Sequence, residues 1–404
     1  MHRSPMITIA RGQVGSAAAQ VLEQVRLGGV VSRDEIAAGT GLSTATVGRA
    51  VGQLTAARLL RERPDRIRAG AVGRPGVPVE IDPDLYVTLG VHLGRRITTI
   101  AVGDLTGRVL AHDSIRRGLD EPPAGVEALG AATARLLGGL PGRAPLAVGL
   151  VGAWRALGLD AGETGAALHE VTGLDVRTGD HIAAVAATEF FHRRPGTSGV
   201  TLYVYARDTV GFAVVVDKGT QTEVSRVGHL GHLPTGSAVP CPCGRVGCLE
   251  VTAGDETLLR LAREAGVVAT TIEDLYAAAH LPAARELLAW RARVLGEAAA
   301  AARDIVDPDR VVLVGQAFTG CPQVLDTITS SFSATAAPGA GDVPVSFTRF
   351  GAGIQAITAC TIGLGAVYDD PLALLAPATG TRSVAVPVAR LRPPATAPLR
   401  KASS

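Results

Sequence analysis

Several features are scarce in this 404-residue sequence, and each scarcity excludes a class of protein. Gly, Arg or Asp interrupts every apolar run before it could span a bilayer, and the N-terminus "MHRSPMITIARGQVGS" lacks the continuous apolar stretch of a signal peptide. There are five cysteines, three of them clustered, which suits a metal in a reducing compartment better than a disulfide framework. We therefore expect a cytoplasmic protein with no membrane partner.

Lysine is also rare, so arginine carries nearly all of the positive charge. The net charge of +2 is unevenly distributed along the chain. Residues 1–85 hold eleven Arg against eight acidic residues, and residues 377–404 hold five basic residues and no acid, which leaves the middle acidic. Such an asymmetry is typical of a protein that binds nucleic acid at one end. With 47% hydrophobic residues, the chain can form two or three domains.

Residues 16–85 have the helical pattern of a small DNA-binding domain. An apolar stripe over residues 12–28 predicts a first helix. The capping box "SRDE" at residues 32–35 opens a short second helix, and "GTGL" makes a tight turn before a third helix with Ser43 as its N-cap. This order of helices and turn is that of a helix-turn-helix.

The outward face of the third helix and the loop behind it favour DNA binding. A helix that enters the major groove from Ser43 would offer Thr44, Thr46 and Arg49 for base or phosphate contacts. Two short strand-like pieces follow, around a loop containing "GRP". Arg74 of that loop is the candidate for a minor-groove contact, because Gly and Pro keep the chain thin and extended. The alternative is a three-helix module that only packs.

From residue 86 onward, strands and helices alternate. Three β-type runs precede a helix, the buried strand "PLAVGLVG" and two more helices; the strand pair "GVTLYVYA" and "TVGFAVVVD" begins a comparable series. Because this series of strands and helices occurs twice, it predicts a mixed α/β fold over residues 86–376, with two similar halves and a cleft between them. We expect residues 1–15 and the Pro-, Ala- and Arg-rich residues 377–404 to be disordered tails.

Taken together, these motifs resemble those of the ROK family (repressors, open reading frames, kinases). The segments "GLSTATVGRAVGQL", "GRPGVPVEIDP", "LGVHLG", "GHLPTGSAVPCPCGRVGCLE" and "DPDRVVLVGQAF" follow one another in the family's order, over about residues 16–376. The chain is similar to the branch of N-acetylglucosamine and xylose repressors. The resemblance implies a winged helix-turn-helix followed by a two-lobed, actin-like body of the sugar-kinase (ribonuclease H-like) type, and a repressor of transcription rather than an enzyme.

The cysteine-rich loop 229–250 is the most specific part of the resemblance, because the corresponding family motif binds zinc. The implied ligands are His232, Cys241, Cys243 and Cys248. Three thiolates and one imidazole make a closed tetrahedral set, which is the structural kind of Zn²⁺ site. Gly244 and Gly247 would let the chain fold back so that the ligands converge. Free buried thiols beside a chance histidine are the alternative, and His229 competes with His232.

The resemblance extends to the nucleotide motifs of sugar kinases, but these are damaged. Where the family resembles D-x-G-G-T, the chain reads "HLGRR" from His92; where it resembles G-T-G-I-G, the chain reads "RDTVG" from Arg207. A third glycine pair is reduced to Gly315. The metal-organising carboxylate is gone, and arginine side chains would obstruct a phosphate. We expect kinase activity to be lost; an active ATP-dependent sugar kinase is the rival interpretation.

Three candidates remain for binding a sugar-type effector, namely Asp180, His232 and Glu250. Asp180 matches the family's catalytic base, yet it would serve equally as the N-cap of the following helix. His229 stands where the family has a sugar-holding Glu. We expect the body to form a homodimer, so that two heads meet a pseudo-palindromic operator in double-stranded DNA, and an effector to bias their geometry. A DNA-binding and dimerisation protein without an effector is the second rival.

Overall fold

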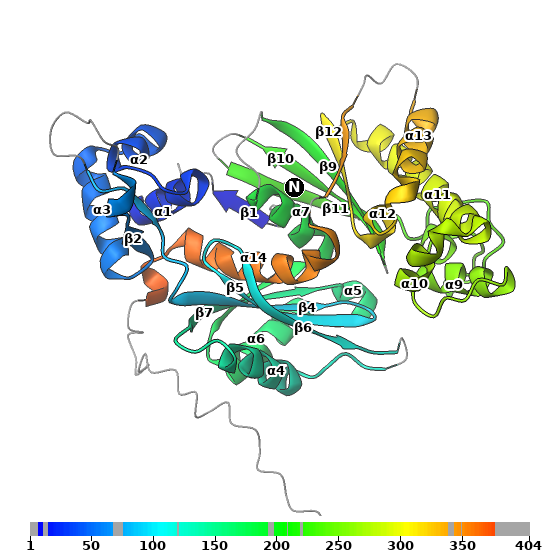
Figure 1. The fold of residues 1–404 in the computed structure, drawn as a ribbon, viewed down its shortest axis with the longest axis horizontal. Coiled ribbons are helices and arrows are strands. Elements are labelled where there is room, and N and C mark those ends of the chain that lie inside the picture. The colour runs from blue at the N-terminus through cyan, green and yellow to red at the C-terminus, as the bar shows by residue number, and fades with distance from the viewer. Residues whose placement is uncertain are drawn as a thin grey trace, which may run out of the picture.

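The computed structural model shows a small head beside a two-lobed body (Figure 1). It describes residues 7–10, 15–67, 76–118, 121–192, 198–207, 209–218, 221–337, 343–348 and 350–375. Arg74 and the tail 377–404 lie outside these ranges. No helix within them is long and apolar enough to cross a membrane.

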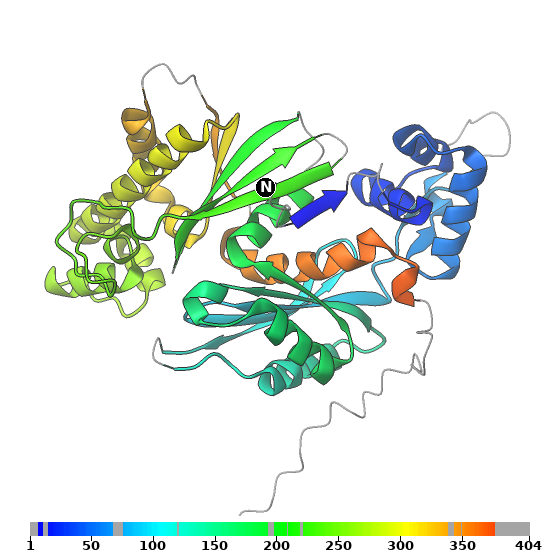
Figure 2. The same cartoon turned by 180° about the vertical axis from the view of Figure 1, so that it is seen from behind.

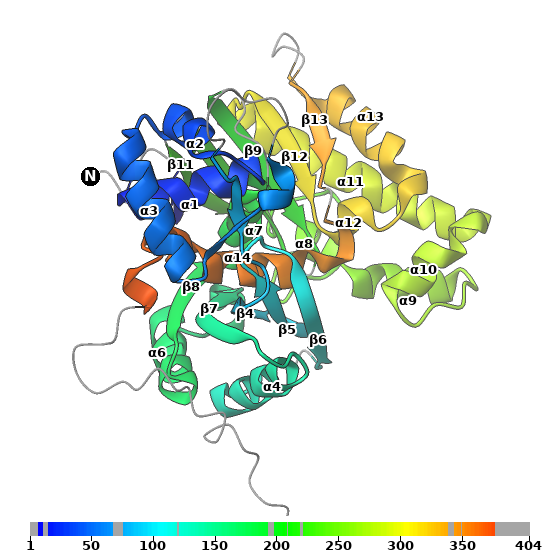
Figure 3. The same ribbon diagram turned by 60° about the vertical axis from the view of Figure 1, so that its left-hand side comes forward.

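The head consists of three helices and a two-stranded ribbon (Figure 3). Its elements are α1 (Ala17–Gly28), α2 (Arg33–Thr40), α3 (Thr44–Ala56), β2 (Leu60–Glu62) and β3 (Val79–Ile81), the two strands being antiparallel. Each helix follows a serine whose side chain accepts a hydrogen bond from the backbone N–H three residues later. At Ser32 the carboxylate of Glu35 completes the predicted capping box, and Gly41 ends α2 with a φ of +73°.

The predicted apolar stripes of the head meet in its interior. Val21, Val25, Val47, Val51 and Leu54 are fully buried. The same hydrophobic cluster continues into the body through Leu105, Phe191, Leu364, Val367 and Tyr368. Head and body therefore share one core, so the head is held against the body by close packing.

The lower lobe of the body is built on a five-stranded sheet. In the order β6-β5-β4-β7-β8, its strands are β6 (Val109–Arg116), β5 (Ile97–Asp104), β4 (Tyr86–Leu93), β7 (Ala144–Gly152) and β8 (Asp175–Asp180). β4, β5 and β6 are antiparallel, whereas β7 and β8 run parallel to β4. A crossover helix precedes each parallel strand, as the alternating pattern predicts.

The upper lobe repeats this plan on a six-stranded sheet. In the order β1-β11-β10-β9-β12-β13, its strands are β1 (Ile7–Ala10), β11 (Gln221–His229), β10 (Val210–Asp217), β9 (Gly199–Ala206), β12 (Arg310–Val314) and β13 (Val345–Phe347). β9, β10 and β11 are antiparallel, and β12 and β13 run parallel to β9. The prediction of a mixed α/β body with two similar halves is confirmed.

β1 corrects one expectation from the sequence. Composition predicts disorder over residues 1–15, yet Ile7–Ala10 pair antiparallel with β11 at the edge of the upper sheet (Figure 2). The expectation is wrong for this segment because "ITIA" is β-prone and β11 would otherwise leave its backbone groups unpaired. A run of four residues is too short to predict a strand without its partner.

Helices cover the sheets and fill the space between them (Figures 1 and 2). The helices of the body are α4 (Val126–Gly138), α5 (Trp154–Leu157), α6 (Ala161–Thr172), α7 (His181–Phe191), α8 (Leu249–Thr252), α9 (Asp255–Glu264), α10 (Ile272–Ala277), α11 (Pro282–Val306), α12 (Gln316–Thr319), α13 (Leu325–Thr335) and α14 (Ile354–Asp369). Short 3₁₀ turns occupy Pro64–Arg66, Ala278–His280, Pro322–Val324, Gly351–Gly353 and Ala373–Leu375. α4 and α6 lie outside the lower sheet, whereas α7 and α14 lie between the lobes.

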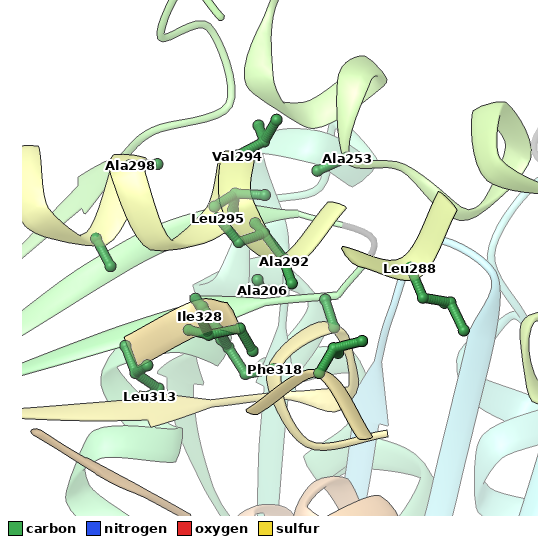
Figure 4. Packing of buried hydrophobic residues seen from close by; sticks show 14 of the residues in the cluster. Ala206, Ala253, Leu288, Ala292, Val294, Leu295, Ala298, Leu313, Phe318 and Ile328 are labelled. Atoms are coloured by element: carbon green, nitrogen blue, oxygen red, sulfur yellow. The ribbon is translucent and has the colours of Figure 1, made fainter. Parts of the chain in front are cut away.

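Close packing fixes α14 and α11 on their sheets. A Cβ at Gly149 of β7 would collide with the carbonyl of Ala359, so glycine is required where α14 crosses the lower sheet. On the upper lobe, Figure 4 shows Leu295, Ile328 and Phe318 turned toward one interior between α11, α13 and α12. The two lobes face each other across α7 and α14.

Candidate functional site

Four potential metal ligands come together just after β11. The ligand atoms of His232, Cys241, Cys243 and Cys248 all lie within 4.8 Å of one another. The Sγ atoms of Cys243 and Cys248 are 3.7 Å apart, and Cys241 Sγ lies 3.8 Å from His232 Nδ1. A tetrahedral zinc ion with Zn–S bonds of about 2.3 Å requires an S···S edge of about 3.8 Å. The donor set and its spacing therefore fit a zinc ion.

The loop reaches this geometry through its glycines and its backbone hydrogen bonds. Gly244 and Gly247 have φ values of +87° and +70°, in the left-handed region that favours glycine. A Cβ at Gly247 would also collide with the carbonyl of Ser237. The N–H of Cys241 donates to the Arg245 carbonyl at 2.8 Å, and this closes the turn that presents two thiols on one side.

The electrostatics of the turn favour a thiolate at Cys243. The backbone N–H of Arg245 and then its side chain hydrogen-bond to the sulfur, and they lower the pKa of Cys243 to about 6. Cys243 is exposed and Cys248 is buried, so the cluster lies at the rim of the upper lobe. Metal ligation needs deprotonated thiols, which this turn helps to supply.

Hydroxyl groups tie the loop to the rest of the upper lobe. Thr235 Oγ1 donates to the Gly247 carbonyl at 2.9 Å. The hydroxyl of Thr252 on α8 lies 3.0 Å from that of Thr235 and 2.6 Å from that of Ser237. Cys248 is the N-cap residue of α8, so a metal at the cluster would fix the start of this helix.

His229, the competing ligand, is not part of the described metal cluster. It ends β11 and is paired in register with Gly211 of β10. His232, nine residues before Cys241, is the histidine that the structure brings to the cysteines. His229 instead lies near the buried His181, whose pKa is lowered first by burial, with a smaller contribution from His229.

Two of the three effector candidates are engaged by other groups of the protein. Asp180 Oδ1 accepts hydrogen bonds from the backbone N–H groups of Ile182 and Ala183 at 2.9 and 3.2 Å, so it caps α7, in agreement with the alternative interpretation. Glu250 Oε1 accepts a hydrogen bond from Arg95 Nη1 at 2.6 Å. The third candidate, His232, belongs to the metal cluster.

Histidine and arginine gather where the nucleotide motifs would lie. His92 is 2% exposed, and neither ring nitrogen has a hydrogen-bond partner among the residues described. Burial, with the nearby His181 and Arg207, lowers the pKa of His92 to about 3. His181 Nε2 lies 2.8 Å from Thr209 Oγ1, which links α7 to the turn between β9 and β10. Residue 92, where the resemblance places the Asp of a kinase motif, is a histidine whose low pKa keeps it neutral at physiological pH.

Four of the predicted DNA-contacting residues lie at the N-cap and in the first half of α3. Ser43 Oγ accepts a hydrogen bond from the N–H of Thr46, and the two hydroxyls are 2.9 Å apart. Thr44 and Arg49 are exposed. Several neighbouring arginines are neutralised by carboxylates, namely Arg33, Arg61 and Arg63. Arg49 has no ion-pair partner within the described part of the head.

A junction that the sequence interpretation missed joins the head to the body. Arg26 of α1 pairs with Glu23 at 2.5 Å, and both side chains are almost completely buried. Its Nη1 donates to the Phe191 carbonyl at the end of α7 at 2.7 Å, and its guanidinium lies 3.9 Å from the centre of the Phe191 ring. Tyr368 of α14 completes this contact. From sequence alone, an i,i+3 Glu–Arg pair is indistinguishable from a solvent-exposed pair.

Comparison with known proteins agrees with this architecture. Residues 88–356 match the model of the ROK family. The chain is 38% identical over 396 residues to Transcriptional regulator Rv0485 of Mycobacterium tuberculosis (strain ATCC 25618 / H37Rv), across 89% of this chain and 87% of that protein. It is 23% identical over 337 residues to the DNA-binding transcriptional dual regulator NagC of Escherichia coli K12, across 76% of this chain and 82% of NagC.

A solved structure has the same fold. The crystal structure of a ROK family transcriptional regulator, a homologue of the E. coli MLC protein, is similar with a TM-score of 0.65 at 21% identity, across 87% of this chain and 96% of that chain. At this identity the likeness shows the fold alone. It confirms the predicted two-lobed body of the actin-like, sugar-kinase type.

Proposed function

This chain belongs to the ROK family, and from that membership we propose that it is a DNA-binding transcriptional regulator, more narrowly a repressor, that acts in the cytoplasm. The observation that carries the proposal is the outward face of α3. Thr44 and Arg49 are exposed on a helix that Ser43 caps, and Arg49 has no ion-pair partner among the described residues. With the ribbon of β2 and β3, this head is a winged helix-turn-helix.

In the proposed complex, α3 enters the major groove. Arg49 and Thr44 contact base edges or phosphates, and Ser43 and Thr46 hold the start of α3 against the DNA backbone. Arg74 of the wing loop reaches the minor groove. The body forms a homodimer, so that two heads meet half-sites about 34 Å apart on a pseudo-palindromic operator. The shared core supports this arrangement because it holds each head in a defined position on its body.

An electrophoretic shift assay on the DNA upstream of the protein's own gene tests the proposal. We expect binding that weakens as salt rises, and Arg49→Ala should cost about 1–3 kcal/mol if it contacts a base, or reduce the salt slope by about 0.9 if it contacts a phosphate. Arg135→Ala on α4 makes the same charge change on the outer surface of the lower lobe and should bind like wild type. Equal binding by wild type and Arg49→Ala would refute the proposed face.

We further propose that kinase activity has been lost. Asp180 is engaged as the cap of α7, His92 replaces the metal-organising carboxylate, and Arg95 holds Glu250. An engaged carboxylate is a poor base for a sugar hydroxyl, and the motifs that hold the phosphates in the family have lost glycines and the carboxylate at residue 92. Turnover of ATP with glucose or N-acetylglucosamine, abolished by Asp180→Asn, would overturn this part of the proposal.

The protein either senses an effector or needs none, and these two possibilities can be distinguished. A sugar-type effector between the lobes would use Asp180, His232 and Glu250, in keeping with the family resemblance. The Arg95–Glu250 contact favours the second candidate, a DNA-binding protein that needs no effector, because one of those side chains is already paired. A thermal-shift screen of sugars, sugar phosphates and nucleotides decides between them. A ligand that raises Tm and changes operator affinity supports sensing, and uniformly null shifts support the second candidate.

We propose that the cluster of His232, Cys241, Cys243 and Cys248 holds a structural zinc ion. The support is its closed set of four donors and their tetrahedral spacing. When bound, the ion would fix the loop and the start of α8 and would carry out no chemistry. Metal analysis of protein purified without chelators should find about one zinc per chain. Protein that is folded and free of zinc would refute the assignment.

A further inference from the structure

Two ion pairs connect the turn between β4 and β5 in the lower lobe to helices of the upper lobe. Arg95 Nη1 lies 2.6 Å from Glu250 Oε1 on α8, and Arg96 Nη2 lies 3.1 Å from Glu256 Oε2 on α9. The partners are 155 and 160 residues apart in the chain. Neither pair belongs to the packing of a single lobe, so each is made only when the two lobes are close.

The turn that carries both arginines is held by its own backbone. The N–H of Gly94 donates to the carbonyl of Ile97 at 3.0 Å, and the N–H of Arg117 donates to the carbonyl of Arg96 at 2.9 Å. β5 and β6 then anchor the turn to the lower sheet. Consecutive arginines on a short, fixed turn lose little backbone entropy when their side chains bind a partner.

The acceptor side is also fixed, and by the loop that carries the metal ligands. The N–H of Glu250 donates to the carbonyl of Gly231 at 2.9 Å. A Cβ at Gly231 would lie only 2.6 Å from Glu250 Oε2, so the carboxylate is seated directly against the backbone before His232. Cys248, two residues earlier, begins α8. Glu250 is therefore presented toward the lower lobe by a rigid support.

From this arrangement we infer that Arg95 and Arg96 form a latch that holds the two lobes together. Arg95 and Glu250 are each about one-third exposed, at 32% and 31%, so water screens their attraction less than that of the exposed pair Arg260–Glu264, at 49% and 58%. A ligand that binds Glu250 Oε1 would compete with the guanidinium of Arg95. The latch does not depend on DNA binding.

Hydrogen exchange measured by mass spectrometry tests the latch. Peptides that cover residues 92–98 and 249–256 report the two sides of the contact. In the double variant Arg95→Ala/Arg96→Ala, we expect these peptides to exchange about threefold faster or more, and the radius of gyration from X-ray scattering to increase. Arg260→Ala on α9 is the matched control, because it breaks an ion pair within the upper lobe. It should leave both readouts as in wild type.

A charge exchange distinguishes the latch from a loss of folding. Arg95→Glu should accelerate exchange, since it places two carboxylates opposite each other, and Arg95→Glu/Glu250→Arg should restore the wild-type rate. Raising NaCl from about 0.05 to about 1 M should open wild type toward the level of the double alanine variant, because the Debye length falls to about 3 Å at 1 M. The latch is refuted if the double alanine variant matches Arg260→Ala, or if exchange rises equally throughout the protein.

Discussion

Replacing Arg26 by alanine should destabilise the attachment of the head to the body more than any surface substitution. The side chains of Arg26 and Glu23 are 8% and 5% exposed, so the pair lies inside the core that head and body share. Alanine removes the cation but leaves the carboxylate of Glu23 without its partner. A buried charge that loses its counter-ion costs about 3–5 kcal/mol.

The individual contacts support that magnitude. Arg26 donates to both oxygens of Glu23, at 2.7 and 2.5 Å, and to the Phe191 carbonyl at 2.7 Å. Hydrogen bonds to charged groups contribute about 1.5–3 kcal/mol each, net of desolvation, and the stacking on Phe191 adds about 1 kcal/mol. Because all three hydrogen bonds share one guanidinium, their contributions do not add in full, and the net loss is expected near 3–5 kcal/mol.

Urea unfolding, with hydrogen exchange of α1 and α7 as the local readout, measures the effect. The matched double variant Glu23→Leu/Arg26→Met removes both charges while keeping the volume, and should recover most of the lost stability. Arg260→Ala, which breaks an exposed pair, should change the unfolding free energy by less than about 1 kcal/mol. If Arg26→Ala falls within that range too, or if the double variant is no more stable than Arg26→Ala, the reasoning fails.

Three further predictions concern His92, Ser43 and Cys243. His92 has a pKa of about 3 in the folded protein, whereas in the unfolded chain it takes up a proton below about pH 6.5. The free energy of unfolding should therefore fall as the pH drops from 6.5 toward 3. In urea titrations, His92→Asn should lessen this dependence by up to about 1.4 kcal/mol per pH unit. Ser43→Ala removes the cap of α3 and should cost about 1 kcal/mol, which Ser43→Asp should largely avoid; equal stability of the two variants would contradict the cap. Cys243→Ser should lower the zinc content well below one per chain and lower Tm, and retention of full zinc would exclude Cys243 as a ligand.

Local signals in the sequence are sufficient to predict much of the head and the metal loop. A capping box sets both the start and the first hydrogen bonds of a helix, so the spacing of Ser32 and Glu35 is enough to pair them. The C-P-C-G turn is equally local, since Cys241 and Arg245 close it with one backbone hydrogen bond. In such segments the partners lie within a few residues, and spacing alone fixes the geometry.

Contacts between distant segments cannot be predicted in the same way. The sequence predicts that Arg95 obstructs a phosphate, but it does not indicate that the partner of Arg95 is Glu250, 155 residues away. Arg26 likewise finds the Phe191 carbonyl 165 residues along the chain. The energy of such pairs depends on burial and on the approach of two rigid elements, neither of which is encoded in local periodicity.

Two such contacts, His181–Thr209 and Arg26–Phe191, lie at opposite ends of α7, and through them we expect the lobes to act on the head. At its first turn α7 is joined to both lobes, because Asp180 ends β8 of the lower sheet while His181 Nε2 contacts Thr209 of the upper lobe. At its last turn the Phe191 carbonyl accepts the hydrogen bond from Arg26 of the head. Eleven helical residues span only about 16 Å and cannot shorten without breaking backbone hydrogen bonds. We therefore expect a change in lobe separation at the first turn to move the last turn. The core shared by head and body is close-packed, so the head can follow only as a unit.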